Sequence, residues 1–348
     1  MNLRSLLVII VLSGCVKEFK PPIRSTKPIL VVEGLLLTDS TPCRVTLSYS
    51  GAYTAVGYLA KSEINDARVF LKNDLNDSIE LINKGNGDYT DETNIMIAQV
   101  GRSYGISIHL ATGERYASLP EKVLPVPQDF EFDSVGTDYP YQNSVLHGAK
   151  VYIRAKDPAG ETNYYRWTVN GYIPRKSWGV PCGNGACRQY CYQFFEDHFI
   201  SVQSDQKVNG NEIRLQHVST TPFYSFGKHY LEIKQLSLTK QAYQFWAQYL
   251  EQTQRTGTIV DPLPSSILGN IYNADKPNEF ALGYFEVSDA VAKKITIDVF
   301  FYYPEVMLEP AIQYIIPGAC EEVYPNAMRF DPPGWQNAPI YPLNIKYY

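Results

Sequence analysis

The sequence lacks the short motifs that mark the commonest catalytic sites. It contains no Gly-x-Ser-x-Gly elbow, no His-Glu-x-x-His, no phosphate-cradling glycine-rich loop before a helix and no dinucleotide fingerprint. Its five histidines are dispersed, and carboxylates adjacent in sequence, such as Glu196-Asp197, point to opposite faces of a strand. We therefore expect no catalytic residues, no metal site and no cofactor. A hydrolase is one hypothesis among three, and turnover by the isolated ectodomain would test it.

Basic charge and long apolar runs are also scarce. The net charge is −5 at pH 7, whereas a nucleic-acid-binding domain needs a basic footprint. The apolar run Leu6–Leu12 is far shorter than the ~20 residues of a membrane-spanning helix. Hydrophobic residues make up 45% and charged residues 19% of the chain, which is ordinary for a globular protein and argues against a disordered one. We expect no nucleic-acid partner.

What is present begins with a signal-like segment. Arg4 precedes the apolar run, and Ser13-Gly14-Cys15 follows it, which is the charged, apolar and small-residue order of a secretory signal peptide. The pattern resembles the bacterial lipobox, in which the cysteine becomes the first residue and is acylated. We expect residues 1–14 to be removed and Cys15 to anchor the protein in a lipid bilayer, since several acyl chains anchor firmly. The alternative is an ordinary secreted protein with an incidental Cys15.

The residues after the cysteine bear on location. Residues 15–28 have the composition of a polar, proline-punctuated tether. Because Val16 is not aspartate, the inner-membrane retention rule of enteric bacteria gives no reason to stay inside, and we expect the outer membrane. Lys17-Glu18 faintly resembles the charged export tags of surface lipoproteins in the Bacteroidota, although a solvated linker explains it almost as well. The periplasmic face and the cell surface both stay open.

Strand signals dominate the rest of the chain, so we expect an all-β fold. Residues 44–50 and 104–110 alternate polar and apolar side chains with period two, as half-buried strands do. Six or seven short strands in about 90 residues predict an immunoglobulin-like β-sandwich over residues 29–127. Three prolines in Leu119–Pro127 indicate a stiff connector at its end.

The second part, residues 128–348, is expected to be a larger mainly-β domain with one inserted amphipathic helix near 239–254. Thr239 is the expected N-cap of this helix. Its apolar face is expected to be core packing and to hold four side chains, Tyr243, Trp246, Tyr249 and Leu250. The tail from Pro317 is rich in Pro, Gly and Asn, and we expect an irregular cover over the domain.

The cysteines indicate a disulfide framework. Besides Cys15 there are five of them: Cys43, Cys182, Cys187, Cys191 and Cys320. Export would place them in an oxidising compartment, where disulfides are the default. A zinc site in the 182–191 cluster is conceivable, but its spacing is not Cys-x2-Cys and no histidine is close. We favour a local bridge that pins this glycine-rich loop, with the third cysteine reaching Cys320 and Cys43 left as a small core thiol.

Tyrosine is abundant, with 27 of the 348 residues. A β-sheet composition accounts for much of this excess, but aromatic side chains also serve interfaces and sugar-stacking platforms. The segment Ser177–Val180 beside the cysteines has the composition of an exposed aromatic loop. We take Trp178, Tyr190 and Tyr192 as candidate ligand-contact residues.

Four segments carry a family resemblance, and they lie at residues 27–34, 236–246, 261–271 and 282–288. Their sequences are KPILVVEG, LSLTKQAYQFW, DPLPSSILGNI and LGYFEVS. In this order they resemble a family of Bacteroidota lipoproteins named domain of unknown function 4249. The tail departs from that family, which often ends with a paired-cysteine segment and a Pro-Asp-Phe-Trp-like close. Here there are one cysteine, Cys320, and Gly334-Trp335.

The resemblance implies an outer-membrane lipoprotein encoded beside TonB-dependent β-barrel transporters, with no established catalytic residues. We therefore expect a non-catalytic accessory or binding component of a TonB-dependent nutrient-uptake system, with the barrel as partner. The alternative is a free-standing surface lipoprotein that binds carbohydrate or peptide, which the tyrosine excess favours.

Overall fold

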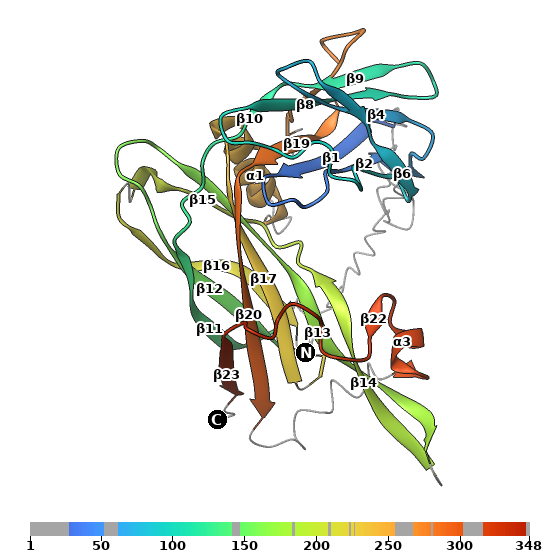
Figure 1. The fold of residues 1–348 in the computed structure, drawn as a ribbon, viewed down its shortest axis with the longest axis vertical. Helices are drawn as coiled ribbons and strands as arrows, with labels where there is room; N and C mark the ends of the chain where they lie inside the picture. The colour runs from blue at the N-terminus through green and yellow to red at the C-terminus, as the bar shows by residue number, and fades with distance from the viewer. Residues whose placement is uncertain are drawn as a thin grey trace, which may run out of the picture.

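The computed structural model describes residues 28–51, 62–140, 147–182, 185–207, 210–222, 224–225, 227–254, 267–279, 281–301 and 316–345. Over these residues the protein is mainly β, with four sheets and one helix of substantial length (Figure 1). The expected β-rich class is therefore confirmed. The predicted signal peptide, the lipidation site Cys15 and nearly all of the tether lie outside the described residues.

The first sheet joins the start of the described chain to a strand from far along it. Its strand order is β19 (Leu282–Ser288), β1 (Leu30–Leu37), β2 (Arg44–Tyr49), β7 (Asp88–Thr90) and β6 (Ile82–Gly85), and β3 (Ser62–Glu63) also pairs with β2. β1 runs antiparallel to β2 but parallel to β19. Gly34 lies opposite Phe285, and a Cβ atom there would come 2.5 Å from the Phe285 ring. Glycine at this position therefore lets the ring pack against the backbone of β1.

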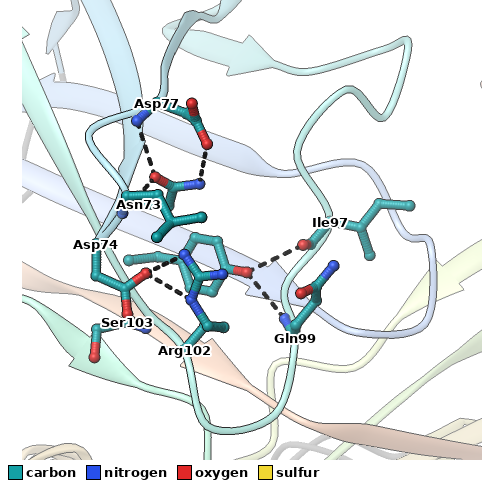
Figure 2. A network of polar contacts seen from close by, with 9 residues as sticks. Asn73, Asp74, Asp77, Ile97, Gln99, Arg102 and Ser103 are labelled. Carbon is teal, nitrogen blue, oxygen red and sulfur yellow. Dashed lines mark hydrogen bonds and ion pairs between the residues drawn. The ribbon is translucent and has the colours of Figure 1, made fainter.

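The second sheet has the strand order β18 (Ile271–Asn273), β9 (Arg115–Ser118), β8 (Ser103–His109), β4 (Arg68–Asn73) and β5 (Ser78–Glu80), and β10 (Glu121–Lys122) pairs with β8. Alternate residues of β8 are buried, as its period-two pattern predicts. A polar network joins the β4–β5 turn to the chain before β8 (Figure 2). In it the Arg102 guanidinium pairs with Asp74, and the Tyr104 hydroxyl accepts a hydrogen bond from the Gln99 backbone N–H.

The first two sheets share one hydrophobic core. Val32 and Leu47 of the first sheet lie in the same buried cluster as Leu71 and Ile108 of the second. This shared core is the contact that a β-sandwich requires, while the immunoglobulin-like topology stays a prediction. The division of the chain at residue 127 also stays a prediction, to which the pairing adds that β18 and β19 return from the second part to complete these sheets.

The other two sheets form a second core. The third sheet has the order β11 (Phe130–Pro140), β12 (His147–Lys156) and β16 (Glu212–Pro222). The fourth has the order β22 (Ala327–Met328), β14 (Gly185–Glu196), β13 (Tyr164–Cys182), β17 (Gly227–Ser237), β20 (Ala290–Phe301) and β23 (Ile340–Ile345), with β15 (Ser201–Ser204) and β21 (Ile316–Pro317) also on β13. The short 3-10 helix η2 (Asp205–Lys207) follows β15. Trp167 of the fourth sheet and Ile153 of the third are fully buried in the common core.

Helix α1 (Lys240–Thr253) confirms the expected helix and its cap. The Thr239 side chain accepts a hydrogen bond of 3.1 Å from the Ala242 backbone N–H. Two members of the predicted apolar stripe, Tyr243 and Trp246, are partly buried against the core cluster. The buried side chains of the helix are Ala242 and Phe245, and Tyr249 is 43% exposed. The helix turns Phe245 toward Tyr284 of β19, with 4.9 Å between the ring centroids, and this tertiary contact fixes the buried face.

The tail is more regular than its composition predicts. The short helix α3 (Cys320–Val323) and β22 lie beside β14, and β23 pairs in parallel with β20. The expected irregular cover is thus wrong for these elements, because pairing with a preformed sheet edge overrides a weak local propensity. None of the described helices is long and apolar enough to cross a membrane.

Candidate functional site

The β13–β14 hairpin extends past β17, its neighbour in the fourth sheet. The pairing of β13 with β17 ends at Tyr172 opposite Tyr230, whereas its pairing with β14 continues to Cys182 opposite Gly185. We name residues 173–194 the hairpin arm, with Phe194 at its base, opposite Tyr172. Figure 1 shows the arm running away from the body of the protein, past α3 and β22.

A disulfide ties the arm to the tail. Cys191 of β14 is bonded to Cys320 of α3, with 5.8 Å between their Cα atoms, and both residues are buried. Tyr324 reinforces this attachment, because its hydroxyl donates a hydrogen bond of 3.0 Å to the Lys176 carbonyl. The expected link from the 182–191 cluster to Cys320 is confirmed.

The prediction for Cys43 is confirmed, whereas those for Cys182 and Cys187 stay predictions. Cys43 is the buried free thiol that we expected, and burial raises its pKa to about 12. Cys182 and Cys187 lie in β13 and β14, opposite Gly185 and Val180. Their side chains are outside the described part of the chain, so the predicted local bridge stays a prediction.

One face of the fourth sheet gathers aromatic side chains. Tyr190, Tyr192 and Phe194 alternate along β14 and therefore share a face. Tyr190 is 53% exposed and Phe194 is 43% exposed. We name the aromatic face by its six members: Tyr172, Tyr190, Tyr192, Phe194, Tyr230 and Trp335.

Contacts between rings connect five of the six members of this face, all but Tyr190. Tyr172 lies edge-to-face against Phe194 and against Trp335, with centroid distances of 5.5 and 5.7 Å. Tyr192 lies 5.3 Å from Tyr230. The structure thus places the predicted residues Tyr190 and Tyr192 on one face with residues that we did not predict. The backbone of Trp178 lies opposite Arg188 on the arm, and its side chain is outside the described part.

A hollow of about 110 Å³ opens beside the aromatic face. The side chains that line it include Lys228, Tyr230, Thr296, Asp331, Trp335 and Gln336. The Tyr192 and Tyr230 hydroxyls interact electrostatically with the Asp331 carboxylate. Burial and this carboxylate raise the pKa of Tyr230 to about 12, and they also raise the pKa of Tyr192, so both hydroxyls stay protonated donors.

Sequence reasoning missed this hollow because its walls come from three distant segments. Tyr230 lies on β17, Thr296 on β20 and Trp335 in the tail. The available signal was the pair Gly334-Trp335, which holds one of the four tryptophans of the chain. A buried strand pattern at 229–234 gave no indication that Tyr230 faces a hollow.

A second polar site lies buried between α1, β10 and β19. The Glu121 carboxylate accepts hydrogen bonds from the Tyr284 hydroxyl, from Thr239 at 2.8 Å and from the Asn270 amide at 3.4 Å. Burial raises the pKa of Glu121 above its ordinary value. Every donor here belongs to the same framework of helix, loop and strand, so the carboxylate fastens these elements together.

Glu286 is a second buried carboxylate that joins neighbouring elements. Its side chain is 1% exposed and pairs with the Arg166 guanidinium at 3.0 Å. The Trp246 indole N–H donates to it at 2.6 Å, and the Arg166 guanidinium lies 4.3 Å from the centre of the Trp246 ring. We name Glu121, Glu286 and these partners the polar junction. Across the described residues, no group of three or more His, Cys, Asp or Glu side chains could hold a metal ion.

The polar junction brings together segments that are far apart in the chain. Thr239 and Trp246 come from the segment at 236–246, Asn270 from 261–271 and Tyr284 from 282–288. The family model described as domain of unknown function (DUF4249) matches residues 16–294. The chain belongs to the DUF4249 family. The resemblance expected from these segments is therefore confirmed.

The extent of the DUF4249 match separates the two sites. It includes the whole polar junction but ends at residue 294, before Thr296, Cys320 and Trp335. The hollow beside the aromatic face is therefore completed by residues beyond the matched region. No curated protein and no solved structure matches this chain.

Proposed function

We propose that this DUF4249 protein is a lipid-anchored outer-membrane lipoprotein that binds rather than catalyses, as an accessory component of a TonB-dependent uptake system. The lipobox-like order before Cys15 supports the anchor. Anchoring in the outer membrane would place the protein in the same bilayer as a TonB-dependent barrel.

The observation that carries the proposal is the exposed aromatic surface of the hairpin arm. Tyr190 presents ring area to solvent where the hairpin extends past β17, and Phe194 does so at the base of this extension, opposite Tyr172. Aromatic side chains are enriched at protein interfaces and dominate their binding energy. The disulfide to Cys320 limits how far the arm can bend, and a preorganised element loses less entropy on binding.

The buried carboxylates favour a binding role over catalysis. A general acid or base must reach the proton that it transfers in a bound substrate. Glu121 and Glu286 are instead almost fully buried and are engaged by donors from the surrounding elements. The polar junction therefore supports a structural role for the residues that carry the family resemblance.

Co-purification from native membranes tests the proposal. After mild cross-linking, the tagged lipoprotein is expected to bring down a stoichiometric TonB-dependent barrel. The double variant Tyr190→Ala/Phe194→Ala should lose the barrel, because it removes the exposed rings of the arm. The variant Tyr249→Ala is the matched control, since Tyr249 and Phe194 are each 43% exposed. Recovery of the wild-type protein without any barrel would contradict the proposal.

The second candidate is a free-standing lipoprotein that binds carbohydrate or peptide. The hollow beside Tyr230 and Trp335 favours it, because concave sites with aromatic and polar walls are typical of ligand pockets. This candidate predicts ligand binding by the protein alone, with no barrel among its cross-linked partners.

A further inference from the structure

We propose that the hollow lined by Tyr230, Thr296, Asp331 and Trp335 is a saccharide site that accepts one neutral sugar ring. This inference deepens the proposed binding role by naming a site and a ligand class, and it does not depend on the barrel.

The floor of the site is rigid and its side chains converge. Tyr230 of β17 lies directly opposite Thr296 of β20, so their side chains stand on the same face of the fourth sheet. Lys228 is two residues from Tyr230 and therefore shares that face. The tail supplies the opposite wall through Asp331 and Trp335. Side chains held on paired strands keep their geometry before a ligand arrives.

The polar groups of the hollow include both hydrogen-bond donors and acceptors. The Asp331 carboxylate is an acceptor that interacts with the Tyr192 and Tyr230 hydroxyls. The Lys228 ammonium is a donor whose strand partner is Asp298, and it forms no hydrogen bond or ion pair within the described residues. Thr296 offers a hydroxyl that can do both. Sugar hydroxyls are also donors and acceptors at once, so this set matches a polyhydroxylated ring.

Aromatic and aliphatic surface completes the match. Trp335 and Tyr230 line the hollow, and Ile340 at its edge is 56% exposed. A pyranose has apolar C–H faces beside its polar rim, and aromatic side chains offer a flat apolar surface with a polar handle for such a ligand.

The size and charge of the hollow decide the ligand class. Its volume of about 110 Å³ holds several water molecules but is smaller than the roughly 300–1,000 Å³ of pockets for larger ligands. One ring fits this space, whereas a peptide of several residues does not. Lys228 and Asp331 carry opposite charges, so the lining favours a neutral ligand over a strongly anionic or cationic one.

The test is a tryptophan fluorescence titration of the detergent-purified mature lipoprotein. The probes are glucose, galactose, mannose, xylose and N-acetylglucosamine at concentrations up to about 50 mM, well above a millimolar dissociation constant. At least one of them should give a saturable change. Trp335→Phe should remove the signal change, because Trp335 lines the hollow.

Variants then locate the binding. Asp331→Asn and Lys228→Gln should each weaken binding by roughly tenfold, the effect of losing one good polar contact. Asp133→Asn on β11 is the control and should bind as the wild type does. Because Lys228 is on the sheet and Asp331 in the tail, a folding defect in one variant leaves the other as a test.

Three results would overturn the inference: no saturable change with any of the five sugars, equal binding by both hollow variants and the wild type, or a response to a tripeptide mixture instead of sugars. Barrel capture through Tyr190 and Phe194 is measured separately, on membranes. Failure of the sugar site and failure of the accessory role are therefore distinguishable.

Discussion

At the scale of single residues, a pair of buried carboxylates outside both sites stands out. Asp157 and Asp205 are 7% and 0% exposed, and the Asn163 amide donates to both. Asp157 also accepts from the Tyr165 hydroxyl at 2.6 Å, whereas Asp205 Oδ1 has no partner among the described residues. Burial, together with the charge of Asp157, raises the pKa of Asp205. The folded structure therefore disfavours the ionised form of Asp205.

The variant Asp205→Asn should stabilise the protein at neutral pH. A carboxyl whose pKa is raised in the folded state contributes to stability when it is protonated. This contribution is complete below the pKa of the unfolded state and is lost as the pH rises through the pKa of the folded state. Asparagine keeps an acceptor for the Asn163 N–H and adds a donor, so we expect a gain of about 1 kcal/mol at pH 7 that shrinks toward pH 4. Denaturant melts at the two pH values measure it, with Asp66→Asn at an exposed position as control. A gain that is equal at both pH values would contradict the assignment.

A second residue-scale prediction concerns the polar junction. Glu286→Ala leaves Arg166, whose side chain is 14% exposed, without its carboxylate, and also leaves the Trp246 indole N–H without its acceptor. Removing one partner of a buried ion pair costs about 3 kcal/mol or more in the free energy of unfolding. The matched control is Glu131→Ala, which breaks a pair with Arg154 whose side chains are 60% and 46% exposed. Similar melting temperatures for the two variants would show that the junction is not a structural centre.

Single residues with local roles could be predicted from the sequence, and those with distant partners could not. Thr239 was predicted as a cap because its acceptor and the Ala242 N–H lie within one helical turn. Cys43 was predicted as a core thiol because strand residues surround it. Glu121 gave no signal, because its partners Thr239 and Tyr284 are 118 and 163 residues away.

At the scale of elements, the hairpin arm and its disulfide carry the next prediction. The double variant Cys191→Ala/Cys320→Ala releases α3 from β14 across a sequence separation of 129 residues. We expect a loss of about 3 kcal/mol in unfolding free energy and faster amide exchange in β14 and β22. Cys43→Ala, which removes a thiol that forms no bridge, should leave exchange in the arm unchanged. Unchanged exchange in β14 of the double variant would mean that strand pairing alone holds the arm.

Elements were predictable where a local pattern decides them. Residues 104–110 alternate so regularly that β8 follows from the sequence, and the helix at 240–253 follows from its cap and apolar spacing. The buried face of α1 was predicted only in part, because the contact of Phe245 with Tyr284 also decides it. β23 was missed because it forms only by pairing with β20, some 40 residues earlier in the chain.

At the scale of the whole molecule, the four sheets form two main hydrophobic cores, and strands from late in the chain complete the sheets of the first core. β18 and β19 complete the first two sheets, while β17 and β20 on either side of them belong to the fourth. The polar junction lies at this crossing, with α1 packed against Tyr284. Pairings between β1 and a strand about 250 residues away cannot be read from local patterns, so the overall assembly was beyond sequence reasoning.

The anchor is a prediction at the same scale. Cys15→Ala should leave the protein unlipidated and release it to a soluble fraction, because acyl chains at this residue are the proposed attachment to the membrane. Fractionation of cells that produce the wild type and the variant measures this release. Retention of the variant in the outer-membrane pellet would mean that protein contacts rather than lipid hold it there.

The central claim is that the hairpin arm meets a TonB-dependent barrel, and site-specific photo-cross-linking tests it most directly. A photoreactive phenylalanine analogue replaces Tyr190 on the arm or, as control, Tyr249 on α1, which are 53% and 43% exposed. After illumination of intact cells, the account predicts a covalent adduct with one barrel from position 190 and none from position 249. Equal labelling from both positions, or no barrel adduct from position 190, would contradict it.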